Sequence, residues 1–196
     1  MHLLDTPAAG RYRVIYADPN WHFATHSAKG QGKSASQHYT TQTVEEMIAE
    51  ALPVSRVAAA DAHLFLWTTW PHLQTAFRLV DSWSDPLRPW DYKTGGTWAK
   101  RPRGWRGDPS KWAFGTGYIF RSASEVLLVF TRGNPTWRSK SERNLWVAPL
   151  REHSRKPEEV RDMIRRATDG PRLEMFAREQ TDGFDVWGRE RHKFNG

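Results

Sequence analysis

Cysteine is absent from this 196-residue sequence. The absence excludes disulfides, thiolate metal ligands and cysteine nucleophiles, and it suits a reducing compartment, so we expect a cytoplasmic location. No apolar run approaches the roughly 18 residues that a membrane-spanning helix needs. The first ten residues also lack the basic and then apolar pattern of a signal peptide. The sequence therefore predicts a soluble protein with no membrane partner.

Other functional patterns are missing as well. The glycines within residues 29–33 are not part of a Gly-Lys-Ser/Thr arrangement that opens a helix, so the sequence does not predict a phosphate-binding loop. The eight histidines are scattered without the spacing of metal ligands, so no metal site is expected. No repeat or internal linker divides the chain. Its length is typical of one domain, which we expect to span residues 1–196.

The composition that is present favours a polyanionic partner. Lysine and arginine number 29 against 22 aspartates and glutamates, which gives a formal net charge of +7. A positive charge of this size attracts nucleic acid, although many basic proteins bind none. The chain also has 11 tryptophans, whose rings either fill the core or stack on bases.

Strand and helix patterns alternate along the chain. Residues 12–17 form an apolar run typical of a buried strand. A helix begins at Thr43, whose spacing to Glu46 is that of a capping box, and Pro53 ends it. Two further helices are predicted after Pro71 and from Pro157. The further strands are predicted at residues 63–67, 90–99, 126–130, 145–148, 172–177 and 184–190. This order predicts an α/β fold with a mostly parallel sheet flanked by helices.

Two long segments lack any periodicity. Residues 22–42 are rich in Gly, Ser, His and Lys and are predicted to form a mobile lid. The strand within residues 90–99 is predicted to be interrupted at Gly95 and Gly96, and it leads into a second loop at 100–117. That loop is either a nucleic-acid clamp, with cations on phosphates and rings on bases, or a solvated surface loop. Its candidate contacts are Lys100, Arg101, Arg103, Trp105, Arg106 and Lys111.

The tetrapeptide Asp18-Pro19-Asn20-Trp21 follows the first predicted strand directly. Alone, Asp-Pro after a strand is an ordinary turn signal. A carboxylate, a rigid proline and a large ring at a strand end would also grip a flat ring that bears an amine. The rest of the chain decides between these two interpretations.

Three separated motifs share their order with a known family. They are Asp18-Pro19-Asn20-Trp21, residues 153–158 (His-Ser-Arg-Lys-Pro-Glu), and residues 173–178 (Leu-Glu-Met-Phe-Ala-Arg) followed by 187–190 (Trp-Gly-Arg-Glu). Supporting matches lie at residues 66–68, 98–100, 117–121 and 125–128. In this order the chain resembles the MT-A family of adenine N6 methyltransferases from about residue 12 to residue 190. The resemblance implies a Rossmann-like methyltransferase sheet, permuted so that the catalytic motif is N-terminal and the cofactor motif C-terminal.

The resemblance also implies the chemistry of the site. The Asp18 carboxylate and the Pro19 carbonyl would each accept one amine hydrogen while the nitrogen attacks the methyl group of S-adenosylmethionine. Trp21 would stack on the target base, which is single-stranded or has left its duplex. The catalytic set is Asp18, Pro19, Asn20 and Trp21. The implied cofactor-binding residues are Asp18, Lys156, Phe176, Arg178, Arg189 and Glu190.

The sequence departs from the family at two of these positions. The family usually has a second proline where this chain has Asn20, and commonly an asparagine where it has Arg189. The Pro19 carbonyl survives the first change, and Arg189 either alters cofactor affinity or brings a phosphate contact into the site.

Three hypotheses on function result. The first is methylation of the N6 amine of adenine in DNA or RNA, with the loops at 22–42 and 100–117 choosing the substrate because no separate recognition domain fits in 196 residues. The second is methylation of a small purine-like amine. The third is a non-catalytic homologue that binds nucleic acid. A homodimer or a complex with a partner subunit stays open.

Overall fold

The computed structural model describes residues 9–21, 43–152 apart from 51–53, and 155–188. The predicted lid at 22–42 and the predicted site residues Arg189 and Glu190 lie outside these ranges. The predicted helix end at Pro53 lies outside them as well. In the described part of the chain, no helix has both the length and the apolar composition needed to cross a bilayer.

Within these ranges, the strands form one seven-stranded sheet in the order β5-β3-β4-β2-β1-β6-β7. Neighbours pair in parallel at β1–β2, β1–β6, β6–β7 and β3–β5, whereas β4 runs antiparallel to both β2 and β3. The strands are β1 (Tyr12–Ala17), β2 (Ala58–Thr68), β3 (Asp91–Arg101), β4 (Ser124–Arg132), β5 (Leu145–Pro149), β6 (Arg172–Met175) and β7 (Asp185–Trp187). The predicted mostly parallel α/β sheet is confirmed.

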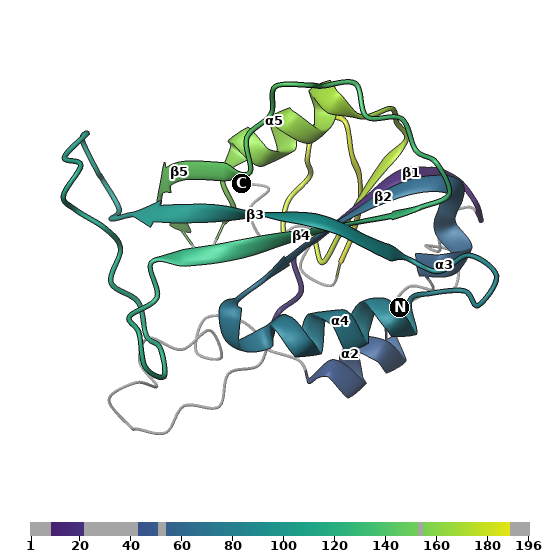
Figure 1. The fold of residues 1–196 in the computed structure, drawn as a ribbon, viewed down its shortest axis with the longest axis horizontal. Coiled ribbons are helices and arrows are strands. Elements are labelled where there is room, and N and C mark those ends of the chain that lie inside the picture. The colour runs from purple at the N-terminus through teal and green to yellow at the C-terminus, as the bar shows by residue number, and fades with distance from the viewer. Residues whose placement is uncertain (1–8, 22–42, 51–53, 153–154, 189–196) are drawn as a thin grey trace.

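Helices cover both faces of this sheet (Figure 1). They are α2 (Val44–Glu50), α3 (Val54–Val57), η3 (Trp70–His72), α4 (Leu73–Ser82) and α5 (Glu158–Ala167). Successive side chains of a strand point to opposite faces, so β1 supplies two cores. Ile15 and Ala17 join the core with α2 and α4, and Val14 and Tyr16 join the core with α5.

Several predicted boundaries need correction. Strand β3 runs without interruption through Gly95 and Gly96. The second glycine leaves room for Trp146 of neighbouring β5, because a Cβ atom at residue 96 would overlap that indole ring. Pro157 is the cap before α5 rather than its first residue. Strand β6 ends at Met175, since Phe176 has a φ of 61° and turns the chain out of the sheet.

The parallel strands position the candidate site. Ala17 of β1 pairs with Leu66 of β2 and with Met175 of β6, so the carboxyl ends of these three strands lie at one edge. In open α/β sheets, residues that follow such ends form ligand sites. The chain therefore delivers its tetrapeptide at residues 18–21, the segment after Thr68 and the segment after Met175 to the same place.

Candidate active site

Asp18 lies between two cations at this edge. The Nζ atom of Lys156 is 2.7 Å from Oδ1 and 2.9 Å from Oδ2, and Nη2 of Arg178 is 3.3 Å from Oδ2. The Asp18 side chain is 16% exposed, that of Lys156 6% and that of Arg178 9%. The structure thus brings together three predicted site residues from the end of β1, the start of α5 and the segment after β6.

The turn after β6 explains how Arg178 reaches Asp18. Beyond Phe176, the amide of Ala177 donates to the carbonyl of Trp187 at the end of β7, at 3.1 Å. Gly188 permits this close approach, because a Cβ atom there would lie 2.6 Å from the Ala177 oxygen. The two strand ends are therefore joined, and Arg178, which follows Ala177, reaches Asp18 at the end of β1.

Glu125 belongs to the same cluster, although the sequence assigned it no role. Its Oε2 is 3.3 Å from Nζ of Lys156, and its Oε1 accepts from Lys100. Burial raises the pKa of Glu125, but the charges of Lys156 and Lys100 outweigh burial and lower the pKa to about 2. Burial lowers the pKa of Lys156, but Asp18 and Glu125 outweigh it and leave the pKa raised. The result is a row of alternating charge.

In the sequence, Glu125 is an acid directly before the apolar strand predicted at 126–130. The sequence did not show in which direction this strand runs, and so did not show at which edge of the sheet Glu125 lies. Because β4 is antiparallel to β2, with Val126 opposite Thr68, the first residues of β4 lie at the edge where β1 and β2 end. A strand that ran parallel would have placed this acid at the opposite edge.

A small polar cavity adjoins the cluster. Its volume is about 20 Å³, and it is lined by Asp18, Arg155, Lys156, Arg161, Glu174, Phe176, Arg178 and Glu179. Arg161 forms one wall, with Nη2 at 2.6 Å from Oε1 of Glu174 and Nε at 3.2 Å from Oε2. Such a bidentate pair is held in a defined geometry. The charged wall is therefore built on β6 and α5.

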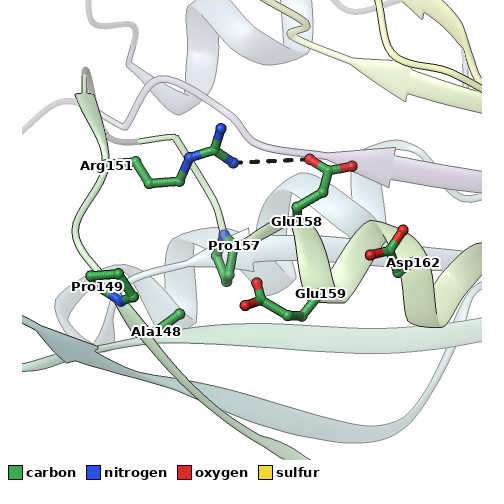
Figure 2. A pocket seen from close by; sticks show the side chains of 7 residues that line it. All are labelled: Ala148, Pro149, Arg151, Pro157, Glu158, Glu159 and Asp162. Carbon is green, nitrogen blue, oxygen red and sulfur yellow. Dashed lines mark ion pairs between the residues drawn. The ribbon is translucent and has the colours of Figure 1, made fainter. Parts of the chain in front are cut away.

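A second cavity of about 310 Å³ shares no lining residue with the first. It is lined by Ala148, Pro149, Arg151, Pro157, Glu158, Glu159 and Asp162, at the end of β5 and the start of α5 (Figure 2). Its Arg151 lies 4.0 Å from Glu158, which also pairs with Arg161 and Arg165. None of the predicted site residues lines this cavity, so we place the candidate site at Asp18.

The rest of the tetrapeptide is compact. The Trp21 amide donates to the Pro19 carbonyl at 2.9 Å, and a carbonyl keeps a second lone pair for another donor. The Trp21 ring is 6% exposed, donates through Nε1 to the Trp67 carbonyl and stacks on His72. The Oδ1 atom of Asn20 is buried and has no hydrogen-bond partner. Trp21 therefore does not present an open ring.

Phe176 has a packing role. Its ring stacks on Trp83, with centroids 6.4 Å apart, and meets the edge of Trp187. It also lines the small cavity. The ring thus closes the core beneath the edge where Asp18 and Arg178 meet.

The predicted clamp residues divide into two groups. Arg101 is buried, with its guanidinium 3.5 Å from the Trp112 ring centroid and Nη1 donating to the carbonyls of Pro109 and Lys111. Lys100 is engaged with Glu125. These two side chains do not face solvent as the clamp hypothesis expects, because both are engaged in contacts within the protein. The exposed members of the set are Arg103, Arg106 and Lys111, with Trp105 half-buried.

A metal centre has no candidate in this part of the protein. Within the residues that the structure describes, no three His, Asp or Glu side chains gather in a group that could hold an ion.

The fold and the site define a class. A mostly parallel sheet with helices on both faces is consistent with a Rossmann-like methyltransferase fold. The chain belongs to the MT-A70 family, whose sequence model matches residues 12–190.

Relatives include enzymes from bacteria and animals. The chain is 31% identical to the type II methyltransferase M.MunI of a Mycoplasma species, over 92% of this chain and 78% of that protein. It is 28% identical to the N(6)-adenosine-methyltransferase catalytic subunit METTL3 of Homo sapiens, over 89% of this chain and 27% of that protein. It is also 28% identical to the N(6)-adenosine-methyltransferase MT-A70-like protein of Drosophila melanogaster, over 91% of this chain and 26% of that protein. The chain spans about a quarter of these animal relatives.

Proposed function

We propose that this chain transfers a methyl group from S-adenosylmethionine to the exocyclic N6 amine of adenine in DNA or RNA. One observation carries the proposal: Asp18 of the tetrapeptide is held by Lys156 and Arg178 at the carboxyl edge of the sheet. Family membership and the adenosine methyltransferases among the relatives support the reaction class.

The tetrapeptide supplies acceptors for the amine. The lone pair of the adenine amine is delocalised into the ring, so the nitrogen becomes nucleophilic only when it is made more pyramidal. The Asp18 carboxylate and the free lone pair of the Pro19 carbonyl would accept its two hydrogens and stabilise the positive charge that develops on nitrogen. Lys156 and Arg178 hold the carboxylate at this edge of the sheet before substrate and cofactor bind.

The charged residues fit the cofactor chemically. S-adenosylmethionine supplies an electrophilic methyl group when it is bound. Its methionine part is a zwitterion, and the row of charges offers Asp18 for an ammonium and Lys156 or Arg178 for a carboxylate. The present cavity of about 20 Å³ holds about one water, so these side chains would have to exchange contacts with each other for contacts with the ligand. Arg189 and Glu190 stay predicted cofactor contacts.

The substrate class follows from exposed charge. Arg103, Arg106 and Lys111 lie on the segment that joins β3 to β4, where cations would contact phosphates without reading sequence. We further infer that residues 1–196 act as one methyltransferase domain, with a homodimer or a partner subunit still to be tested.

Nucleoside mass spectrometry tests the proposal. The protein and S-adenosylmethionine are incubated with single- and double-stranded DNA, with RNA and with free adenosine, and the products are digested and scored for N6-methyladenine. We expect methylation of at least one nucleic acid by the parent and none above background by Asp18→Ala. The matched control is Asp91→Ala, which removes an exposed carboxylate 3.8 Å from Lys93 and should keep full activity.

The same assay separates the alternatives. Methylation of free adenosine alone, with binding that is insensitive to salt, would instead support the small-amine hypothesis. Unmodified adenine in every substrate, together with no heat of S-adenosylmethionine binding in calorimetry, would support a non-catalytic homologue. Activity of Asp18→Ala equal to that of the parent would remove the assigned site.

A further inference from the structure

Trp21 is buried, so its ring does not offer the target base an open face. Its Nε1 donates to the Trp67 carbonyl at 3.0 Å, and one ring face lies on His72, with centroids 5.6 Å apart and planes at 21°. His72 is held in turn by Thr69 at 2.9 Å. A base that stacks needs an open ring face, and only 6% of Trp21 is exposed.

Trp70 has the exposure that Trp21 lacks. It begins η3, two residues after β2 ends, and it is 52% exposed. Single exposed aromatic residues are common and need no explanation by themselves. Trp70 differs because its Nε1 donates to Oγ of Ser124 at 2.9 Å across 54 residues of sequence. The ring is therefore anchored at one end while much of its surface remains in solvent.

The anchor places Trp70 at the edge of the sheet that carries the charged cluster. Ser124 is the first residue of β4. Glu125 follows it with its side chain on the opposite face of the sheet, where it contacts Lys156, which contacts Asp18. The exposed indole thus borders the edge where the amine acceptors lie. It comes from the segment that follows β2, directly beside the tetrapeptide that follows β1, because these strands are parallel neighbours.

Other exposed aromatic rings lie on the segment just before Ser124. Ser122 donates to the Ser124 carbonyl at 3.3 Å, and its own carbonyl accepts from Gly115 at 2.9 Å. The segment between these residues lies in the stretch that projects beyond the sheet between β3 and β4 (Figure 1). Phe114 is 75% exposed and Phe120 85%, and the Arg121 guanidinium lies 5.3 Å from the Phe114 ring centroid. Rings interleaved with cations are the surface to which single-stranded nucleic acid binds.

We propose that Trp70, rather than Trp21, is the ring on which the target base stacks while Asp18 and Pro19 engage its amine. The base belongs to a single-stranded or extruded nucleotide, since an adenine within a duplex exposes no face to a protein ring. Trp21 then has a packing role: it fixes the turn that presents Asp18. That the stacked base is adenine rests on the proposed function. That a base stacks on Trp70 does not depend on it.

A binding experiment isolates the stacking step. Single-stranded oligoadenylates, one of DNA and one of RNA, carry a central 2-aminopurine, whose fluorescence is quenched when it stacks on an indole. Binding is followed by anisotropy and by quenching. We expect Trp70→Ala to weaken the better ligand about tenfold or more and to abolish the quenching, and Trp70→Phe to keep most of the affinity because a ring remains.

The matched control is Trp137→Ala. Trp137 is 41% exposed, but it packs on His63 and Phe65, and Phe65 belongs to the core on the α5 side of the sheet. Its loss should leave both the anisotropy and the quenching unchanged. Ser124→Ala removes the anchor and keeps the ring, and we expect an intermediate loss of affinity. Thermal unfolding of each variant shows whether its fold is intact.

The outcomes distinguish the two proposals. Trp70→Ala binding within about twofold of the parent, or a parent that binds neither oligonucleotide, would overturn the role of Trp70. A parent that binds and quenches through Trp70 but methylates nothing would overturn the proposed reaction and leave the stacking site in place. The KM for the nucleic acid should rise in Trp70→Ala while the KM for S-adenosylmethionine stays unchanged.

Discussion

Lys156 donates to both carboxylate oxygens of Asp18, at 2.7 and 2.9 Å, across 138 residues of sequence. The same ammonium is 3.3 Å from a carboxylate oxygen of Glu125, near the start of β4. One buried cation therefore separates the buried carboxylate of Glu125 from the partly buried carboxylate of Asp18. This relationship links the stability of the fold to the geometry of the candidate site, and it leads to the first two predictions.

Replacing Lys156 with methionine should destabilise the protein strongly. The change leaves Asp18 and Glu125 close together with one shared counter-charge removed, and breaking a buried ion pair in this way costs about 3–5 kcal/mol. Urea denaturation measures the free energy of unfolding. Lys93→Met, at an exposed lysine 3.8 Å from Asp91, should change it little. A loss below about 1 kcal/mol for Lys156→Met would contradict the buried network.

Glu125 should make the fold sensitive to strong acid. Its pKa in the folded protein, about 2, lies below the ordinary value of 4.5, so the unfolded chain binds the proton first as the pH falls. The contribution of Glu125 to stability is complete above about pH 4.5 and is lost as the pH drops toward 2. Melting temperatures measured across this range should fall less steeply in Glu125→Gln. Parallel curves for parent and variant would show that Glu125 is not the group involved.

His63 should act at milder pH. Burial lowers its pKa from 6.5 to about 4, so the folded protein keeps the ring neutral while the unfolded chain takes up a proton. Stability is therefore complete above about pH 6.5 and declines between 6.5 and 4. His63→Phe keeps a ring against Phe65 and Trp137 but cannot titrate. We expect its melting temperature to stay flatter over this interval, and an unchanged slope would argue against the assignment.

Arg101 and Arg106 should have opposite effects although both belong to the predicted clamp. Arg101→Ala removes contacts with Trp112 and two carbonyls and should lower the free energy of unfolding by about 2 kcal/mol. Arg106 is exposed, so Arg106→Ala should leave stability unchanged and weaken binding to an oligonucleotide, with a shallower dependence on salt. Denaturation and salt titrations check the pair. A stable Arg101→Ala variant would show that the loop does not need this side chain.

A side chain at Gly96 should lower the stability of the fold. A Cβ atom there meets the Trp146 ring, so Gly96→Ala forces the indole to move and should cost about 1–3 kcal/mol. Trp146 packs edge-on against Trp67, so the movement should also be visible in near-ultraviolet circular dichroism. Combining the change with Trp146→Leu should restore part of the loss. An additive double variant would show that the two residues do not compete for the same space.

Local structure could be predicted from short stretches of sequence. Strand β1 has the predicted bounds because its apolar run ends at a polar residue and a proline. The capping box at Thr43 is present, with the Thr43 amide 2.7 Å from a Glu46 oxygen and the Glu46 amide 3.2 Å from the Thr43 hydroxyl. These features depend on groups within a few residues of each other, so the sequence alone determines them.

The resemblance to the family implied which residues carry the chemistry. It named Asp18, Lys156 and Arg178 from three motifs in the family's order, and the structure brings their side chains together. Parallel strands with helical connections place the ends of several strands at one edge, so residues that follow strands are the natural candidates.

Only the tertiary structure decided how those residues are used. The direction of β4 placed Glu125 beside Lys156, packing against Trp112 buried Arg101, and contacts with Trp67 and His72 enclosed Trp21 while Trp70 stayed exposed. Each outcome depends on partners that are distant in sequence. Hydrophobic periodicity reflects the buried face of one helix or strand, and capping reflects hydrogen bonds between near neighbours. The exposure and pairing of a side chain depend instead on strand order and direction, which a local pattern does not determine.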